Sequence, residues 1–113
     1  EYVVTQMFFD NDKYFEFEKK CRDNGIDIPI IPGLKPIATK NQLNVIPYRF
    51  HIDMPDDLIR EVEKCKDNKG VHQVGIEWCI KQSRELIEKG VPVLHYYSMG
   101  RSSNIQAIAS AVF

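Results

Sequence analysis

The residues best suited to bind a ligand gather at the end of one apolar run late in the chain. The run 93–97 reads Val-Leu-His-Tyr-Tyr, and it ends in a short loop that carries Tyr97, Met99 and Arg101. A tyrosine ring and a thioether offer flat or polarizable apolar contact. An arginine offers a planar set of N–H donors that a lysine lacks. The stretch therefore predicts a binding loop.

No pattern in the sequence indicates a metal centre, nucleophilic catalysis or a phosphate cradle. His51, His72 and His95 share no metal-ligand spacing, so we expect no metal. His95 lies inside the apolar run and is predicted to be a buried core histidine. We find no Ser-His-Asp or Cys-His arrangement and no glycine-rich loop of the kind that holds phosphates.

The elements that must position this loop repeat a strand–helix order. The run 93–97 lacks polar alternation, which is typical of a parallel strand covered on both faces, and apolar spacing predicts a helix at 104–112. Apolar and β-branched runs predict two earlier strands, at 2–9 and 26–31. The stretch 32–36, Pro-Gly-Leu-Lys-Pro, is predicted to be a stiff turn after the second of them.

Two helices are predicted from apolar residues at helical spacing, at 12–23 and 71–89. Each is followed by a glycine, Gly25 or Gly90, that suits the left-handed conformation at a helix C-terminus. Gly75 lies inside the longer helix and is predicted to permit close packing.

Two shorter helices are predicted in the middle of the chain. Thr39 and Gln42 form a Thr-x-x-Gln capping box at the start of the first, and Pro47 is predicted to end it. Asp53 with Pro55 resembles the N-cap and early proline of the second.

The repeated order predicts an α/β protein built from three consecutive βα units. Three parallel strands cannot close on themselves, so we interpret residues 1–113 as a partial (β/α)8 TIM barrel that lacks the earlier strands. A small open doubly wound sheet is the alternative. In either case unpaired strand edges predict partner strands from elsewhere in the full chain, or homo-oligomerisation through the edge.

Composition limits the partners. A formal net charge of −1 leaves no basic field for nucleic acid or an anionic membrane. Three widely spaced cysteines favour reduced, buried thiols in a cytoplasmic protein over a disulfide framework. The sequence shows no hydrophobic run of transmembrane length and no signal peptide.

Three strings in this order resemble the last three βα units of methylenetetrahydrofolate reductase, a flavin-dependent barrel enzyme. They are Val4-Thr5-Gln6-Met7-Phe8-Phe9-Asp10, Ile30-Ile31-Pro32-Gly33-Leu34-Lys35-Pro36-Ile37 and His95-Tyr96-Tyr97-Ser98-Met99-Gly100-Arg101. The resemblance covers essentially the whole chain. It implies an enzyme that uses FAD to carry a hydride from NADH or NADPH to methylenetetrahydrofolate, giving methyltetrahydrofolate in one-carbon metabolism.

The resemblance also implies a role for each matching residue. Gln6 would face the flavin and contact the pterin or nicotinamide, and Gln42 would contact folate. Tyr97 and Met99 would line the substrate site, and Arg101 would meet the substrate. Structural alternatives stay open: a strand-end hydrogen bond for Gln6, helix capping for Gln42, barrel core for Tyr97 and Met99, and a solvated loop position for Arg101.

The match departs from the family at Ile46, where bacterial relatives often place a stacking phenylalanine. The general acid and most flavin-binding segments belong to earlier strands, so no catalytic residue is assigned here and the chain alone is expected to be inactive. The alternative function is a free-standing, non-catalytic binding or assembly module.

Overall fold

The computed structural model describes residues 1–97 and 103–113. The described residues form three strands and five helices, with three helices in succession between the second and third strands. In chain order they are β1 (Val3–Met7), α1 (Asn11–Asp23), β2 (Ile30–Leu34), α2 (Gln42–Phe50), α3 (Asp56–Glu63), α4 (Asn68–Glu88), β3 (His95–Tyr96) and α5 (Ser103–Val112). The side chains of Ser103 and Asn104 are outside the described part of the chain.

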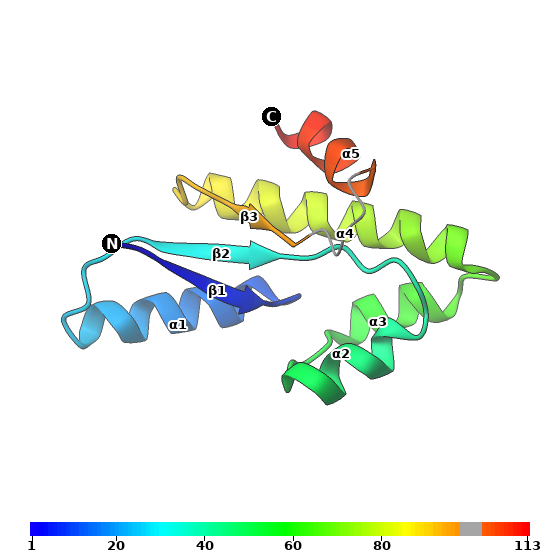
Figure 1. Cartoon of the computed structure of the whole chain (residues 1–113), viewed down its shortest axis with the longest axis horizontal. Helices are drawn as coiled ribbons and strands as arrows, with labels where there is room; N and C mark the ends of the chain where they lie inside the picture. Colours follow the sequence, from blue (N-terminus) through cyan, green and yellow to red (C-terminus); the bar gives the residue numbers. More distant parts are fainter. Residues whose placement is uncertain (98–102) are drawn as a thin grey trace.

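The three strands form one parallel sheet in the order β1-β2-β3, as the sequence predicted (Figure 1). Val3 pairs with Ile30, and Gly33 pairs with His95. All three strands therefore present their carboxyl ends at the same edge of the sheet. Ligands of parallel α/β proteins bind at that edge.

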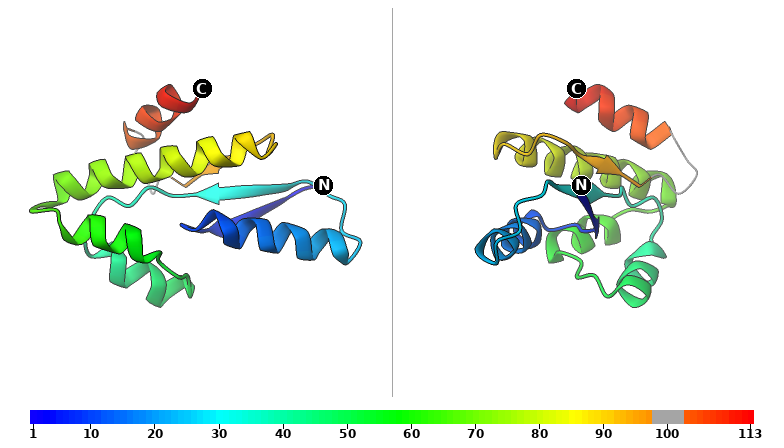
Figure 2. Two further views of the ribbon diagram at one scale, coloured as in Figure 1. Left: turned by 180° about the vertical axis from the view of Figure 1, so that it is seen from behind. Right: turned by 60° about the vertical axis from the view of Figure 1, so that its left-hand side comes forward.

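Helices α1 and α4 lie on the same side of the sheet, as Figures 1 and 2 show from opposite directions, and α5 packs against α4. One core cluster fills the space between these helices and the sheet: Phe8, Tyr14, Ile30, Leu34, Ile76, Cys79, Leu86, Val91 and Ile108. A second cluster joins the carboxyl end of β1 to α2, α3 and the start of α4: Met7, Phe9, Ile37, Ile46, Leu58, Val62 and Val71.

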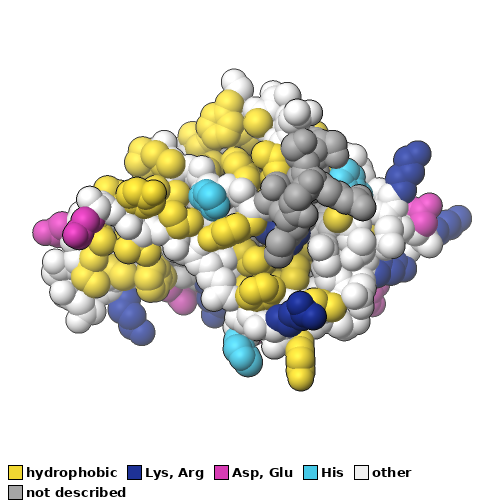
Figure 3. All heavy atoms as spheres, in the orientation of Figure 1, with side chains coloured by type: hydrophobic (Ala, Val, Ile, Leu, Met, Phe, Trp, Pro, Cys, Tyr) yellow, Lys and Arg dark blue, Asp and Glu magenta, His cyan; other side chains and the backbone are white. Residues whose placement is uncertain are grey.

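No described helix crosses the other face of the sheet in Figure 1, and hydrophobic side chains are visible on this side of the molecule in Figure 3. Val3, at the start of β1, is 40% exposed, and Val93, two residues before β3, is 52% exposed. A parallel sheet is normally covered on both faces. The bare face is consistent with the predicted need for further structure.

The second strand begins later than the sequence predicted, at Ile30 instead of Ile26, and it contains Pro32 and Gly33. The predicted turn at 32–36 is therefore wrong at its start. The Arg22 guanidinium accounts for part of the difference, because Nη1 donates to the Ile26 and Ile28 carbonyl oxygens at 2.8 and 2.7 Å. These bonds keep residues 26–28 out of the hydrogen-bonded pairing between β2 and β1.

Proline is tolerated inside β2 because the neighbouring strand bulges opposite it. Val4 pairs with Ile31 and Met7 pairs with Gly33, so Thr5 and Gln6 together stand opposite the single residue Pro32. Proline cannot donate to a ladder and is found at bulges for that reason. The sequence gives no local sign of this pairing.

Four other expectations were wrong. The strand β3 is confined to His95–Tyr96, and His95 is exposed instead of buried in the core. Pro47 lies inside α2, which ends at the left-handed His51 with φ of 53°. The N-cap of α3 is Pro55, not Asp53.

The predicted roles of Gly25, Gly90 and Gly75 were confirmed. The side chain of Asp10 accepts from the Asp12 N–H at 3.0 Å and caps α1. Gly25 and Gly90 take positive φ angles of 80° and 90° after α1 and α4. Gly75 packs so closely that an added Cβ would lie 1.8 Å from the Ile37 carbonyl oxygen.

Candidate functional site at the strand ends

The bulge in β1 shapes the carboxyl edge of the sheet. The Thr5 hydroxyl oxygen accepts from the Gly33 N–H at 3.0 Å, and the Thr5 carbonyl oxygen accepts from the Tyr97 hydroxyl at 2.9 Å. The ring of Tyr97 therefore reaches from the end of β3 across β2 to β1. A Cβ at position 33 would lie 2.6 Å from the ring atom Cε2, so only glycine fits beneath this ring.

Gln6, the next residue in the bulge, has an exposed side chain at the strand end. Its carboxamide nitrogen donates to the Phe50 carbonyl oxygen at 2.8 Å. This bond confirms that the glutamine has a strand-end partner. The carboxamide oxygen has no hydrogen-bond partner among the described residues, so it can accept from a ligand.

Gln42 lies at the start of α2 and is half-buried. Its carboxamide oxygen accepts from the backbone N–H groups of Ala38 at 2.6 Å and Thr39 at 3.2 Å. The bond to the Thr39 N–H that the capping box predicted is thus present, but α2 begins at Gln42 and its N-cap is Asn41 instead of Thr39. The carboxamide nitrogen has no partner among the described residues and can donate to a ligand.

The structure joins the predicted site residues only in part. Tyr97 and Gln6 belong to one cluster, because both are tied to Thr5, one through a hydrogen bond and the other through the chain. Gln42 and the partner of Gln6 sit on opposite ends of the same helix, α2. Met99 and Arg101 lie outside the described residues, so their roles stay predictions.

A polar network on the helix side of the sheet holds the segment after Gln6, and its residues were not among the predicted site residues. The Gln82 carboxamide nitrogen donates to the Phe8 carbonyl oxygen at 3.2 Å and to the Asn11 side-chain oxygen at 3.1 Å. The Trp78 indole donates to the Phe9 carbonyl oxygen at 2.8 Å. Polar residues at core-facing positions of α4 were the available signal.

Two buried ionisable side chains lie near this layer but do not form a reactive pair. Burial lowers the pKa of Lys35, whose ammonium lies 3.4 Å from the Pro36 carbonyl oxygen. Burial raises the pKa of Cys79 to about 12. Cys79 is therefore a thiol at neutral pH, and thiols are poor nucleophiles.

A second tyrosine of the same strand faces the helices. The Tyr96 hydroxyl lies 2.7 Å from the Ser83 hydroxyl, and burial raises the pKa of Tyr96. The Tyr96 hydroxyl therefore bonds on the helix side of the sheet, and the Tyr97 hydroxyl bonds to the strand β1.

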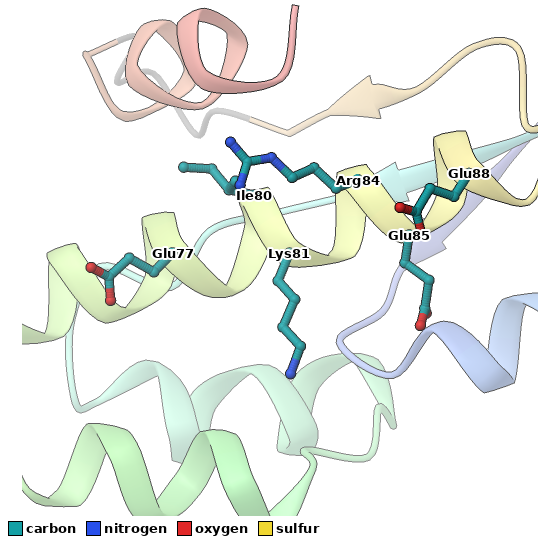
Figure 4. Close-up of a pocket in the computed structure, with 6 residues that line it drawn as sticks. All are labelled: Glu77, Ile80, Lys81, Arg84, Glu85 and Glu88. Atoms are coloured by element: carbon teal, nitrogen blue, oxygen red, sulfur yellow. The ribbon is translucent and has the colours of Figure 1, made fainter.

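The concave surface in Figure 4 lies on α4, away from the strand ends. Charged side chains dominate its lining, and the labelled residues spread in different directions from the helix: Glu77, Ile80, Lys81, Arg84, Glu85 and Glu88. Arg84 is already engaged with the Ala111 carbonyl oxygen of α5 at 3.1 Å. This surface offers no convergent set of polar groups for a ligand.

A more apolar groove runs along the free edge of β1. Its lining comes from β1 and α1: Val3, Val4, Thr5, Gln6, Phe8, Lys13, Tyr14 and Phe17. Phe17 of α1 is 45% exposed beside this groove. An apolar groove beside an unpaired strand edge suits a neighbouring strand and helix.

Among residues 1–97 and 103–113 no group of three or more His, Cys, Asp or Glu side chains could hold a metal ion. No helix in the same part of the chain is long and apolar enough to cross a membrane. All three cysteines are free, with Cys79 buried and the other two half-buried.

A parallel sheet backed by helices on one face defines an α/β protein, with amide and aromatic side chains forming a candidate site at its carboxyl edge. Sequence comparison specifies the family, because the family model described as "Methylenetetrahydrofolate reductase" matches residues 1–112. The chain belongs to the methylenetetrahydrofolate reductase family.

Two relatives show how much of a full-length protein the chain represents. It is 33% identical to "Probable methylenetetrahydrofolate reductase (NADPH)" of Caenorhabditis elegans, over 98% of this chain and 17% of that protein. It is 27% identical to "5,10-methylenetetrahydrofolate reductase" of Escherichia coli, over 94% of this chain and 36% of that protein. The chain thus spans about a sixth to a third of the length of these relatives.

A solved structure shares the fold at lower sequence identity. It is described as "Uncharacterized protein from Clostridium thermocellum binds two copies of 5-methyl-5,6,7,8-tetrahydrofolic acid". The TM-score is 0.51 at 22% identity, and the match covers 98% of this chain and 41% of that chain. The match supports the parallel α/β arrangement.

Proposed function

We propose that this chain is the folate-side part of a flavin-dependent methylenetetrahydrofolate reductase. The full-length enzyme would reduce methylenetetrahydrofolate to methyltetrahydrofolate with NADH or NADPH. Residues 1–113 would form three consecutive βα units of its (β/α)8 barrel, with the site at the carboxyl ends of the strands. The whole protein would be cytoplasmic, and the chain alone would be inactive.

The observation that carries the proposal is the exposed carboxamide of Gln6 at the carboxyl end of β1. Its oxygen is free among the described residues, and its nitrogen is held by the Phe50 carbonyl oxygen. A pterin is a flat ring bordered by donors and acceptors, and a carboxamide can pair with either kind of group. Family membership makes a pterin the expected ligand.

Other residues would complete the pocket around that amide. The Gln42 carboxamide nitrogen would donate to folate while its oxygen caps α2. The ring of Tyr97 and the thioether of Met99 would supply apolar contact. Arg101 would hold a carboxylate or a carbonyl of the benzoyl-glutamate tail in a planar fork.

The residues present fit a flavin at one position only. The Gln6 carboxamide oxygen is an exposed acceptor at the strand ends, as the N–H edge of an isoalloxazine ring requires. FAD supplies hydride transfer from the reduced nicotinamide. The rest of its binding site would come from the earlier barrel strands, in agreement with the bare sheet face and the groove beside β1.

The test uses the full-length protein. We expect it to purify with a yellow flavin and to oxidise NADH or NADPH when methylenetetrahydrofolate is supplied. Residues 1–113 expressed alone should bind neither flavin nor reduced nucleotide. A full-length protein without flavin and without folate-dependent oxidation would support the binding-module alternative.

A further inference from the structure

The bulge in β1 leaves one backbone group without an ordinary ladder partner. Thr5 and Gln6 stand opposite Pro32, which has no N–H to donate. The next N–H along β2, that of Gly33, is taken by the Thr5 hydroxyl oxygen at 3.0 Å. The donor for the Thr5 carbonyl oxygen comes instead from the third strand, as the Tyr97 hydroxyl at 2.9 Å.

Tyr97 is itself held in place by several contacts, so its hydroxyl can restrain the Thr5 carbonyl. Its backbone N–H donates to the Leu34 carbonyl oxygen at 2.8 Å, so the residue extends the pairing of β3 with β2. Its ring lies over Gly33, where any side chain would collide with it. The edge of the exposed His95 ring packs against it, with ring centroids 4.6 Å apart. Both ends of Tyr97 are thereby fixed.

The Thr5 carbonyl that Tyr97 restrains belongs to the peptide that connects Thr5 to Gln6. Fixing its direction fixes the orientation of that peptide plane and so the position of the Gln6 Cα. The pairing of Met7 with Gly33 restrains the chain on the other side of Gln6, and the two restraints together set the direction of the Cα–Cβ bond. A carboxamide that hydrogen-bonds to the edge of a planar ring must be oriented accurately to be effective. The bond from Tyr97 therefore acts on Gln6, the side chain whose exposed carboxamide carries the proposed function.

We infer that Tyr97 is a positioning residue whose hydroxyl, by holding the Thr5 carbonyl, orients the Gln6 carboxamide toward folate. This inference rests on the proposed function. It adds to the expected ring contact of Tyr97 a separate role for its hydroxyl, which donates inward to the protein and not to a ligand.

A double-mutant cycle in the full-length enzyme tests the inference. The variants are Tyr97→Phe, which removes only the hydroxyl, Gln6→Ala, and the two combined. Loss of one hydrogen bond predicts that Tyr97→Phe weakens methyltetrahydrofolate binding about fivefold to tenfold, with flavin content unchanged. In the Gln6→Ala background the same change should have no further effect, because the side chain that Tyr97 orients is gone.

Tyr96→Phe is the matched control. It removes the same group from the adjacent residue, but that hydroxyl bonds Ser83 on the helix side of the sheet. We expect less than a twofold change in folate binding. If Tyr97→Phe lowers the flavin content, the cycle is measured on the flavin-loaded fraction of each protein, because a variant that retains flavin has folded.

The possible failures are distinct. Suppose that Gln6→Ala weakens folate binding, and that Tyr97→Phe weakens it by the same fold-change with and without Gln6. The hydroxyl then acts independently of Gln6, and this inference is overturned while the proposed function stands. If Gln6→Ala leaves folate binding unchanged, the folate role of Gln6 fails and this inference fails with it.

Discussion

The carboxamide nitrogen of Gln6 donates to the Phe50 carbonyl oxygen at 2.8 Å, across 44 residues of sequence. This bond ties the carboxyl end of β1 to the C-terminus of α2, where carbonyl oxygens lack intrahelical donors. The candidate ligand-reading group is thereby held by a second element of the chain. A ligand can use the free carboxamide oxygen without breaking this bond.

Gln6→Glu should damage both functions of the side chain. A carboxylate has no N–H for the Phe50 carbonyl and places a negative charge beside it. We expect about 1 kcal/mol lower stability of the full-length protein in urea unfolding. Folate binding should also weaken, in a titration monitored by flavin absorbance. Gln6→Glu with unaltered stability would show that the bond to Phe50 contributes nothing.

Gln42 allows its two roles to be separated by one pair of variants. Gln42→Ala removes the acceptor for the Ala38 and Thr39 N–H groups and should cost about 1 kcal/mol of stability. Gln42→Glu keeps an acceptor at the helix N-terminus, so stability should be retained. Folate affinity should fall in both variants, measured by the same titration. Full folate affinity in Gln42→Glu would leave capping as the only role.

Gly75→Ala should destabilise the protein strongly. The added Cβ would lie 1.8 Å from the Ile37 carbonyl oxygen, and a backbone atom cannot move aside without displacing α4 from the segment after β2. Overpacking of this kind costs about 3 kcal/mol or more. Gly70→Ala is the control within the same helix, since its Cβ would meet side-chain atoms of Cys65 at 3.3 Å and Asp67 at 3.6 Å and no backbone atom that close. Comparable unfolding midpoints for the two variants would contradict the packing account.

Stability should fall in alkaline solution through Cys79. Burial raises the pKa of this thiol from 9.0 to about 12, so above pH 9 the unfolded chain loses a proton that the folded chain keeps. The stabilisation is complete below pH 9 and is lost between pH 9 and 12. From this group alone, the free energy of unfolding should be about 1 kcal/mol lower at pH 10 than at pH 8.

Cys79→Ala isolates that contribution, because other groups titrate in the same range. The lowered pKa of Lys35 acts in the opposite direction, with stability rising as pH approaches 10.5. The difference in unfolding free energy between wild type and Cys79→Ala should therefore shrink between pH 8 and pH 10. A constant difference would show that the thiol ionises equally in both states.

The sequence predicted the parallel βα order because apolar runs, caps and the glycines after α1 and α4 are local signals. It misplaced β2 because Pro32 and Gly33 read as a turn when considered alone. Both residues are explained by contacts from other strands: the bulge opposite Pro32 and the Tyr97 ring over Gly33. Tertiary pairing overrode local propensity there.

In the candidate site, too, local interactions were predictable and long-range interactions were not. The cap made by Gln42 lies within four residues and was readable as a motif. The bond from Tyr97 to Thr5 spans 92 residues, and the bond from Gln82 to Phe8 spans 74, so neither has a local signature. The residues that orient the strand ends come from distant segments, and sequence spacing does not reveal them.

We expect the carboxamide of Gln6 to hydrogen-bond to folate at the carboxyl end of β1. The most direct measurement is the dissociation constant of methyltetrahydrofolate for the full-length protein and its Gln6→Ala variant, with flavin content determined on the same samples. We predict about tenfold weaker binding in Gln6→Ala and equal flavin content. Equal dissociation constants in the two flavin-loaded proteins would contradict the claim.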